Sequence, residues 1–470
     1  MEIREGLSFD DVLLVPKRNT FGSRKSIDIS SLLTRHISLK LPIASANMDT
    51  VTEADMAIAM ANAGGIGIIH RFNTIEEEVE QVKKVKRKSS YIIKDPYTVS
   101  PDTTVETIRK LKEDKGVSGF PVVVGKKLVG IVTNRDLKFA EDTERAKDIM
   151  TGKKDLIVAY AGKKPSSQDL IDMFKKYKVE KIPIVDKNFN LVALVAAKDI
   201  ESLSNKQISK SKDGTLLVGA AIGIKSDAME RASELIKAGV DVLVIDVAHG
   251  HSDLVIELLK KLKKEFEIDV IAGNVATKDG TEALIEAGAD AVKVGIGPGH
   301  VCTTRLVAGA GVPQLTAIID SYSIAKEYGV PIIADGGINT SGDIVKAFAA
   351  GASTVMIGSL FAGTDETPGY LIMRNNQKFK LYRGMSSVSA NIKKNELDNA
   401  EFDSEEIVGE GVETFVPYKG SVKDILAQLA GGIRSGLSYS GARNIDELRK
   451  NAEFIKLAPG ARRESFERPI

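Results

Sequence analysis

Eight short apolar runs, most of them separated by helical patterns, constrain the fold of this 470-residue chain more than any other feature. They are Leu41–Ala46, Ile66–Ile69, Leu216–Ala221, Val242–Asp246, Val270–Gly273, Ala291–Val294, Ile332–Asp335 and Val355–Gly358. Amphipathic patterns such as Asp253–Phe266 and Gly280–Ala287 lie between them. Parallel strands alternating with helices in this number predict an α/β fold, a (β/α)8 TIM barrel, whose chemistry lies on loops at the C-terminal strand ends.

The alternation stops after the second run, and the chain then repeats itself. Val117–Val123 followed by Leu128–Leu137 is echoed by Val179–Val185 followed by Leu191–Ile200. Because each copy pairs a helical pattern with a hairpin, the two copies predict a separate domain inserted into the barrel. The expected boundaries are 1–90 and 206–470 for the barrel and 91–205 for the insert.

Charge and composition exclude several classes of function. The net charge of +1 gives no field that would attract nucleic acid, and a single cysteine excludes an intrachain disulfide. Met1–Asp10 lacks the apolar core of a signal peptide, and no run approaches the roughly 20 apolar residues of a membrane span. We expect a cytoplasmic protein with no nucleic-acid or membrane partner.

The glycine-rich stretch Gly295–Arg305 is the strongest candidate for chemistry. Gly295, Gly297 and Gly299 let backbone N–H groups approach a ligand that side chains would block. Cys302 follows them, and oriented N–H dipoles favour its reactive thiolate form. A lone cysteine is more often a small buried residue, but its place on a Gly-Pro-Gly loop favours a nucleophile.

Polar or glycine residues also follow four other predicted strands, where a barrel places its active site. They are Asp246, Asn274, Asp335-Gly336-Gly337 and Gly358-Ser359. Each alone is as readily a turn former, but agreement among five strand ends indicates one site. Backbone N–H groups of the last two stretches can hold an anion near a helix start, and Asp335 can accept a ribose hydroxyl. The expected substrate is a phosphorylated small molecule.

Barrel periodicity fails again between about Gln377 and Tyr418. A segment of this length without clear structure is usually a mobile lid over an active site, and the alternative is a solvated loop with no role. We interpret residues 386–416 as an active-site flap.

Several of these stretches together resemble the IMP dehydrogenase/GMP reductase family over almost the whole chain. The matching stretches are Gly295–Arg305, Asp335–Gly337, Met48–Val51, Tyr382–Met385 and Val416–Gly420. The inserted repeat resembles a tandem pair of CBS motifs, a Bateman module, which implies regulatory purine nucleotides as ligands. The resemblance also implies GMP or IMP as substrate, and a homotetramer that can pair into an octamer.

The resemblance implies roles for individual residues. Cys302 matches the nucleophile that attacks purine C2, while Thr304 and Glu410 match the pair that moves protons there. Glu405, Glu406 and Glu413 lie close to Glu410 in the sequence and compete with it for this assignment. The remaining implied residues are His300, Asp335, Gly337, Gly358, Ser359, Tyr382, Gly384, Met385 and Ser386 for the substrate, Asp246, Asn274 and Gly295 for the cofactor, and Gly297, Gly299 and Cys302 for a potassium ion (K+).

The two branches of the family differ in the fate of a shared thioimidate on C2. The resemblance implies that IMP dehydrogenase forms it with NAD and hydrolyses it to XMP. GMP reductase forms it by expelling ammonia from GMP and reduces it with NADPH to IMP. Dehydrogenases resemble one another in an Arg-Tyr pair on the flap that activates water. Between Ser386 and Gly411 this chain has neither residue, and its cations and aromatics there are Lys393, Lys394 and Phe402.

Because hydrolysis needs a base, this absence favours an NADPH-dependent GMP reductase. Gly384–Ser387 and Ala46–Asp49 also resemble the reductase form. The CBS pair, the long flap, Asp246–His251 and Asn274–Thr277 read more like an NAD-dependent IMP dehydrogenase, which is the alternative. A catalytically silent nucleotide sensor is a third hypothesis, disfavoured because the catalytic residues are present.

His300 departs from both branches, which usually carry serine at this position. A cationic imidazole can bind the nucleotide phosphate, in which case affinity rises at mildly acidic pH. Equally, the side chain can be a bulky neighbour whose backbone alone contacts the ligand. The sequence leaves both readings open.

Overall fold

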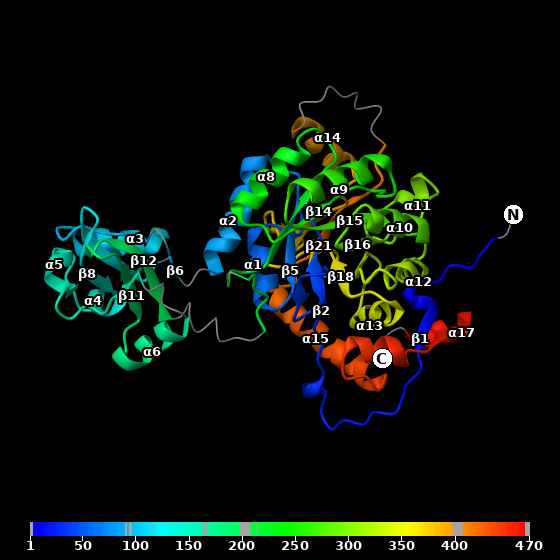
Figure 1. The fold of residues 1–470 in the computed structure, drawn as a ribbon, viewed down its shortest axis with the longest axis horizontal. Helices are drawn as coiled ribbons and strands as arrows, with labels where there is room; N and C mark the ends of the chain where they lie inside the picture. The colour runs from blue at the N-terminus through cyan, green and yellow to red at the C-terminus, as the bar shows by residue number, and fades with distance from the viewer. Residues whose placement is uncertain are drawn as a thin grey trace. The chain divides into compact units, whose positions relative to one another are not determined.

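The computed structural model describes residues 3–89, 92–93, 96–115, 117–162, 167–197, 207–212, 214–397 and 408–465. The chain divides into two compact units. Figure 1 colours the chain by residue number, from blue at the N-terminus to red at the C-terminus. One combines Met1–Lys88 with Gln207–Ile470, and the other spans Ser89–Lys206. Residues 198–200 of the predicted repeat and 398–407 of the predicted flap lie outside the described residues.

The first unit contains the predicted barrel. Its strands are β4 (Ile43–Ser45), β5 (Ile66–Ile69), β13 (Val218–Ile222), β14 (Val242–Ile245), β15 (Asp269–Val275), β16 (Ala291–Val294), β17 (Ile332–Asp335) and β18 (Thr354–Ile357). They close in the order β13-β14-β15-β16-β17-β18-β4-β5, with every pair parallel. The predicted fold is therefore confirmed, with strand ends shifted by up to a few residues.

Both faces of the barrel strands are buried, which explains their continuous apolar sequences. In β14, Val242 and Val244 join the cluster inside the barrel, whereas Leu243 and Ile245 pack in the layer shared with the surrounding helices. Gly67 in β5 allows α1 to lie close, since a Cβ there would be 2.4 Å from the Cα of Ala57. The core thus fixes the strand ends from which the loops of the site emerge.

Helices and short strands surround the barrel. The helices are α1 (Ala54–Asn62), α2 (Ile75–Ser89), α8 (Ala228–Ala238), α9 (Asp253–Glu265), α10 (Lys278–Glu286), α11 (Thr304–Val307), α12 (Gln314–Ala325), α13 (Ser341–Ala350), α14 (Val388–Leu397), α15 (Val422–Tyr439), α16 (Ile445–Asn451) and α17 (Pro459–Arg462), with 3-10 turns at Phe9–Asp11, Arg24–Ser26 and Arg463–Ser465. The short strands are β1 (Val12–Leu14), β2 (Ser31–Leu32), β3 (Ser38–Leu39), β19 (Ile372–Arg374), β20 (Gln377–Arg383), β21 (Glu413–Pro417) and β22 (Phe454–Lys456).

Part of the predicted flap is regular structure, which corrects the interpretation of that segment as lacking any. Helix α14 covers its first residues, and strand β21 at its end pairs with β20. The sequence of α14 is mostly polar, so its pattern alone indicates no buried face. The helix is held instead by contacts with segments distant in sequence, among them an ion pair between Lys393 and Asp49.

The second unit consists of two similar halves. Its elements are β6 (Ile92–Ile93), α3 (Val105–Lys115), β7 (Gly119–Val124), β8 (Lys127–Thr133), α4 (Asn134–Leu137), α5 (Ala146–Ile149), β9 (Thr151–Gly152), β10 (Ala159–Tyr160), α6 (Ser167–Tyr177), β11 (Lys181–Val185) and β12 (Leu191–Ala196). The hairpin β7–β8 aligns Phe120 with Val132, and the hairpin β11–β12 aligns Ile182 with Val195. Each half buries its own apolar cluster.

A buried contact between a guanidinium and a carboxyl group joins α2 to α8 beside the barrel. Arg231 Nη1 donates to Glu78 Oε2 at 2.7 Å, and the Glu78 side chain is fully buried. Desolvation by burial outweighs the attraction of Arg231 and raises the pKa of Glu78 from 4.5 to about 8. The folded protein therefore holds a proton on Glu78 at pH values where the unfolded chain has lost it.

This proton makes stability depend on pH. Its contribution is complete below about pH 4.5 and is lost as pH rises towards about 8, because ionisation favours the unfolded chain in that window. Glutamine resembles the protonated acid at every pH. We therefore expect the melting temperature of Glu78→Gln, relative to that of the native protein, to be higher at pH 9 than at pH 6. Thermal melts of both proteins at the two pH values test this, and an equal difference at both would contradict it.

Candidate active site

A cavity of about 590 Å³ lies at the C-terminal ends of the barrel strands. Every site residue predicted from the sequence lines it. These are Asp246, Asn274, Gly295, Gly297, Gly299, His300, Cys302, Thr304, Asp335, Gly337, Gly358, Ser359, Tyr382, Gly384, Met385, Ser386 and Glu410. Loops far apart in the sequence therefore meet around one space, as the barrel rule requires.

Cys302 begins a short chain of hydrogen bonds. Its Sγ donates to Thr304 Oγ1 at 3.2 Å, and Thr304 Oγ1 donates to Glu410 Oε2 at 2.7 Å. The chain gives the thiol proton a route to a carboxylate, and the same route run backwards delivers a proton to a group leaving from beside the sulfur. Among the competing glutamates, Glu405 and Glu406 lie outside the described residues, while Glu413 bonds Ser389.

The backbone on both sides fixes Glu410 in this position. The N–H of Thr303 donates to Glu410 O, and the N–H of Glu410 donates to Ser386 O, both at 2.9 Å. One step further, the N–H of Val412 donates to Val301 O at 3.0 Å. The end of the flap is thus held between the cysteine loop and the loop after β20.

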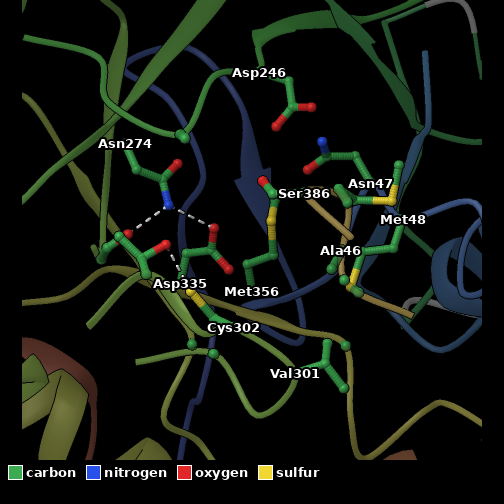
Figure 2. Close-up of a pocket in the computed structure, with 18 of the residues that line it drawn as sticks. Ala46, Asn47, Met48, Asp246, Asn274, Val301, Cys302, Asp335, Met356 and Ser386 are labelled. Carbon is green, nitrogen blue, oxygen red and sulfur yellow. Dashed lines mark hydrogen bonds between the residues drawn. The ribbon is translucent and has the colours of Figure 1, made fainter. Parts of the chain in front are cut away.

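Asp335 stands at the centre of a polar network across three strand ends. Its Oδ2 accepts from Asn274 Nδ2 at 2.9 Å and lies 3.0 Å from Lys293 Nζ. Asn274 Nδ2 also donates to Gly295 O at 2.8 Å, and its Oδ1 accepts from Lys293. Figure 2 shows the second carboxylate oxygen of Asp335 directed away from Asn274. The network orients this carboxylate as an acceptor for a ligand hydroxyl.

Asp246 lies in a different part of the cavity from Cys302 (Figure 2). Its Oδ2 pairs with Arg71 Nε at 3.3 Å, and both side chains are 17% exposed. The guanidinium also lies against the loop after β13, since a Cβ on Gly223 would be 3.2 Å from Arg71 Nη1. Lys225 lines the same end of the cavity as Arg71, whose charge is balanced by Asp246.

Glycines and a phenol form the wall near Asp335. Gly336 and Gly337 have φ of +93° and +77°, which turns the backbone in a way other residues rarely adopt. Tyr382 is buried, and its Oη lies 3.9 Å from Met48 Sδ. Burial first, and the nearby Asp335 carboxylate second, raise the pKa of Tyr382 well above its usual range. The phenol therefore stays protonated and can donate a hydrogen bond, but it is a poor base.

Arg71 and Lys293 are cavity residues that the sequence interpretation missed. Lys293 is 2% exposed and interrupts the apolar run of β16, so a charge inside a predicted strand would have indicated it. Arg71 comes two residues after β5, where the strand-end rule also applied. His249 and His251, in the stretch Asp246–His251, are both exposed, and their ring centroids are 6.3 Å apart.

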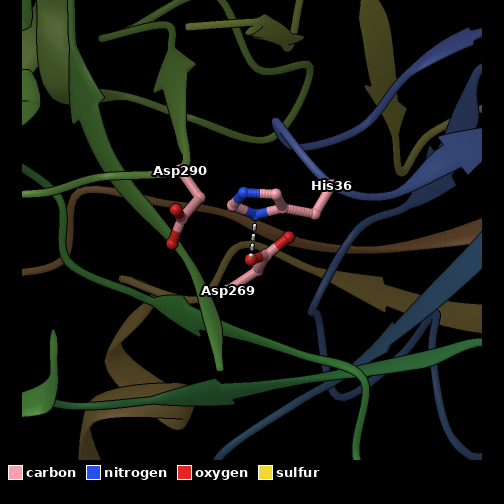
Figure 3. Close-up of side chains that lie close together, drawn as sticks. All are labelled: His36, Asp269 and Asp290. Atoms are coloured by element: carbon pink, nitrogen blue, oxygen red, sulfur yellow. Dashed lines mark hydrogen bonds and ion pairs between the residues drawn. The ribbon is translucent and has the colours of Figure 1, made fainter. Parts of the chain in front are cut away.

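A cluster of metal-ligand types lies elsewhere, at the N-terminal ends of β15 and β16. Figure 3 shows its members, His36, Asp269 and Asp290, with His36 Nδ1 2.7 Å from Asp269 Oδ1. Asp290 is already paired with Lys263 Nζ at 2.7 Å and with Arg35 Nη2 at 3.2 Å. Two cations against two carboxylates leave no negative charge to attract a metal ion, so these contacts are structural.

The fold and the site define a class: an α/β barrel whose cavity at the C-terminal strand ends holds a cysteine thiol hydrogen-bonded through a threonine to a glutamate. The chain belongs to the IMP dehydrogenase / GMP reductase domain family, whose model matches residues 6–467. Members are purine nucleotide oxidoreductases that use a nicotinamide cofactor. Within the described residues, no helix has the length and apolarity needed to cross a membrane.

Individual relatives divide between the two branches of the family. The chain is 51% identical to an inosine-5'-monophosphate dehydrogenase of Nitrosopumilus maritimus, covering 97% of each chain. It is also 51% identical to that of Aquifex aeolicus, covering 99% of this chain and 95% of the relative. Among solved structures, the GMP reductase of Trypanosoma brucei in complex with guanosine 5'-monophosphate matches with a TM-score of 0.94 and 44% identity, covering 100% of this chain and 98% of that one.

Proposed function

We propose that this protein is a GMP reductase that converts GMP to IMP and ammonia with NADPH. The observation that carries the proposal is the Cys302–Thr304–Glu410 chain, which is suited to protonating a departing amine. The flap between Ser386 and Gly411 contains no arginine or tyrosine to activate water. Of its two lysines, Lys393 is directed to Asp49, 3.8 Å away.

The residues of the chain account for each proton and bond. The Cys302 sulfur adds to C2 of GMP after its proton passes through Thr304 to Glu410. The same proton returns to the C2 amino group, which leaves as ammonia with the electrons of its bond to carbon. This leaves a thioimidate between C2 and sulfur. NADPH, when bound beside C2, would supply the hydride for that carbon, and Cys302 accepts the electrons of the C2–sulfur bond and leaves as the thiolate when IMP is released.

Other cavity residues bind and orient in this proposal. Asp335 accepts from the ribose, while the stretches at Gly337, Gly358 and Ser359 hold the phosphate with the Tyr382 hydroxyl. The expected contacts from His300, Gly384, Met385 and Ser386 belong to the same nucleotide. Since all of these residues line one cavity, a single bound nucleotide can reach them.

We place the nicotinamide dinucleotide at the other end of the cavity. Asp246, Asn274 and Gly295 would hold its nicotinamide half, and we assign the additional phosphate of NADPH to the side of the cavity lined by Arg71 and Lys225. Carbonyl groups of Gly297, Gly299 and Cys302 would hold a potassium ion that stiffens the cysteine loop. That loop already curls back on itself, because Gly299 O accepts from the N–H of Cys302 at 3.1 Å.

For the second unit we propose a Bateman module at residues 91–205 that binds regulatory purine nucleotides. Its two similar halves, each a hairpin with helices, support this assignment. A further solved structure of the T. brucei GMP reductase, in complex with guanosine 5'-triphosphate, matches with a TM-score of 0.82 and 41% identity. A homotetramer or octamer in the cytoplasm belongs to the same proposal.

IMP dehydrogenase is the second candidate function, favoured by the names of relatives that are 51% identical. Hydrolysis of the thioimidate would need a base in the cavity. The phenol of Tyr382 retains its proton, and Arg71 and Lys293 are paired with Asp246 and Asp335. The Thr304–Glu410 pair remains as a weaker activator of water. We therefore give the absence of an arginine and a tyrosine from the flap more weight than the 51% identity to dehydrogenases, and we keep GMP reductase as the proposed function.

A pair of assays distinguishes the two activities. With GMP and NADPH, we expect nicotinamide absorbance to fall with release of IMP and ammonia in equal amounts. With IMP and NAD, we expect at most one equivalent of reduced cofactor per active site, because the thioimidate is not hydrolysed. Steady production of XMP would overturn the reductase assignment and establish the dehydrogenase.

A further inference from the structure

Asp49 is a buried carboxylate in the loop after β4, and no step above uses it. Its side chain is 3% exposed and binds the guanidinium of Arg383 through Nη2 and through Nε, the latter at 3.2 Å. Next to it, Thr50 Oγ1 accepts from the N–H of Arg383 at 3.3 Å, and the N–H of Asp49 donates to Met385 Sδ at 3.4 Å. Two residues of this loop thus anchor the chain that follows β20.

Arg383 connects Asp49 to the strand that follows Glu410. It stands directly opposite Glu413 in the register of β20 and β21, with Nη1 3.7 Å from Glu413 Oε2. Helix α14 closes the network: Ser389 Oγ donates to Glu413 at 2.6 Å, and Lys393 Nζ lies 3.8 Å from Asp49 Oδ2. Ser389 and Lys393 are four residues apart and so share one face of the helix. We call this network the Asp49 hub; its members are Asp49, Arg383, Ser389, Lys393 and Glu413.

The Asp49 hub supports the backbone on which Glu410 rests. The N–H of Glu410 donates to Ser386 O, and the N–H of Gly384 donates to Val412 O at 3.0 Å. Both Ser386 and Gly384 lie in the segment that Arg383 starts and Asp49 anchors. Among the described residues, removing the Asp49 charge would leave the Arg383 guanidinium, 14% exposed, with one ion pair, the longer one to Glu413. An unpaired charge in such a place displaces the chain that carries it.

We propose that Asp49 is a positioning residue for the reaction. Through Arg383 it sets the backbone that places Glu410 within hydrogen-bonding distance of Thr304, and through Lys393 it ties α14 to the barrel. The inference rests on the role proposed above for Glu410. Asp49 contacts neither the thiol nor its relay, so its effect on chemistry is indirect.

The test compares a step that needs Glu410 both to accept the thiol proton and to protonate the amine with a step that needs it only to accept the thiol proton. For Asp49→Asn we expect release of ammonia from GMP to slow about 30-fold or more, with the KM for GMP changed less than about 3-fold. Formation of the covalent adduct from IMP and NADP+ uses Glu410 to accept the thiol proton but expels no amine, so it should slow clearly less, by under about 5-fold. For Lys393→Met, which removes an exposed and longer pair, we expect a loss of about 2- to 5-fold.

Two comparisons guard against a general loss of structure. The double variant Asp49→Asn, Lys393→Met should be no slower than Asp49→Asn alone, because both changes act on one network. Lys237→Met removes a lysine of α8 that pairs with Glu234 at 2.6 Å and is 68% exposed, and it should leave every rate unchanged. Thermal melts establish that each variant is folded.

The outcomes that contradict the inference are distinct. If Asp49→Asn slows ammonia release and adduct formation equally, Asp49 supports the fold or the thiol and not Glu410. If it slows neither, the hub has no role in chemistry. If the native protein does not release ammonia from GMP at all, the proposed function fails, and this inference fails with it.

Discussion

Cys302→Ala is expected to abolish turnover of GMP with NADPH, and equally that of IMP with NAD, by a factor of at least about 10⁴. Both reactions require a bond between sulfur and C2, and alanine offers no nucleophile. The methyl group fits where the thiol was, so the Gly295–Arg305 loop should keep its conformation. Steady-state assays with a detection limit below this factor provide the measurement.

Binding gives the control for this variant. GMP should still raise the melting temperature of Cys302→Ala, because the contacts proposed for Asp335, Gly337, Gly358 and Ser359 do not depend on the thiol. Denatured native enzyme quenched during turnover should carry the mass of a nucleotide on Cys302, and the variant should carry none. Surviving turnover in the variant would exclude the covalent route altogether.

Glu410→Gln is expected to slow ammonia release from GMP by about 10²- to 10³-fold, the usual contribution of a positioned acid. The amide has the size of the acid and can keep the hydrogen bond with Thr304, but it cannot carry the proton. Affinity for GMP should be unchanged, since Glu410 contributes to the leaving of the amine and not to holding the nucleotide. Single-turnover measurement of ammonia after mixing with saturating GMP tests the effect.

Thr304→Val provides the companion variant. It interrupts the same hydrogen-bond chain between the sulfur and Glu410, so it should slow ammonia release by a similar factor. When Thr304→Val is combined with Glu410→Gln, the rate should fall little further, because either substitution alone already interrupts proton transfer between the sulfur and Glu410. A native rate in Glu410→Gln would transfer the role to another glutamate. Additive losses would show that the two residues act separately.

Much of the barrel could be predicted because its strands are buried on both faces. The local sequences of Val242–Ile245 and Ala291–Val294 predict strands by themselves. Loops that follow parallel strands of a barrel lie at the same end of it. That rule brings Asp246, Asn274 and Cys302 into one cavity without any knowledge of distances. The two halves of the second unit were visible for a similar reason, because a repeat needs no three-dimensional information to be seen.

Helix α14 and the pairing of the buried charges could not be predicted from the local sequence. The helix has no apolar stripe, and its partners Asp49 and Glu413 are distant in the chain. The Lys293–Asp335 and Arg71–Asp246 pairs connect different strand ends, so neither residue identifies its partner by spacing. Local pattern predicts which faces are buried, whereas the pairing of charges across a barrel depends on how the strands close.

The second unit is inserted in the connection between β5 and β13 of the barrel, and it does not disturb the pairing of these two strands. The chain leaves after α2 and returns before β13, yet β5 and β13 remain hydrogen-bonded neighbours, with Gly67 opposite Val218. The entropy of closing a connection grows only by about 0.6 kcal/mol for each doubling of its length. The inserted unit can therefore lengthen, shorten or be exchanged in evolution while the ring of strands stays closed.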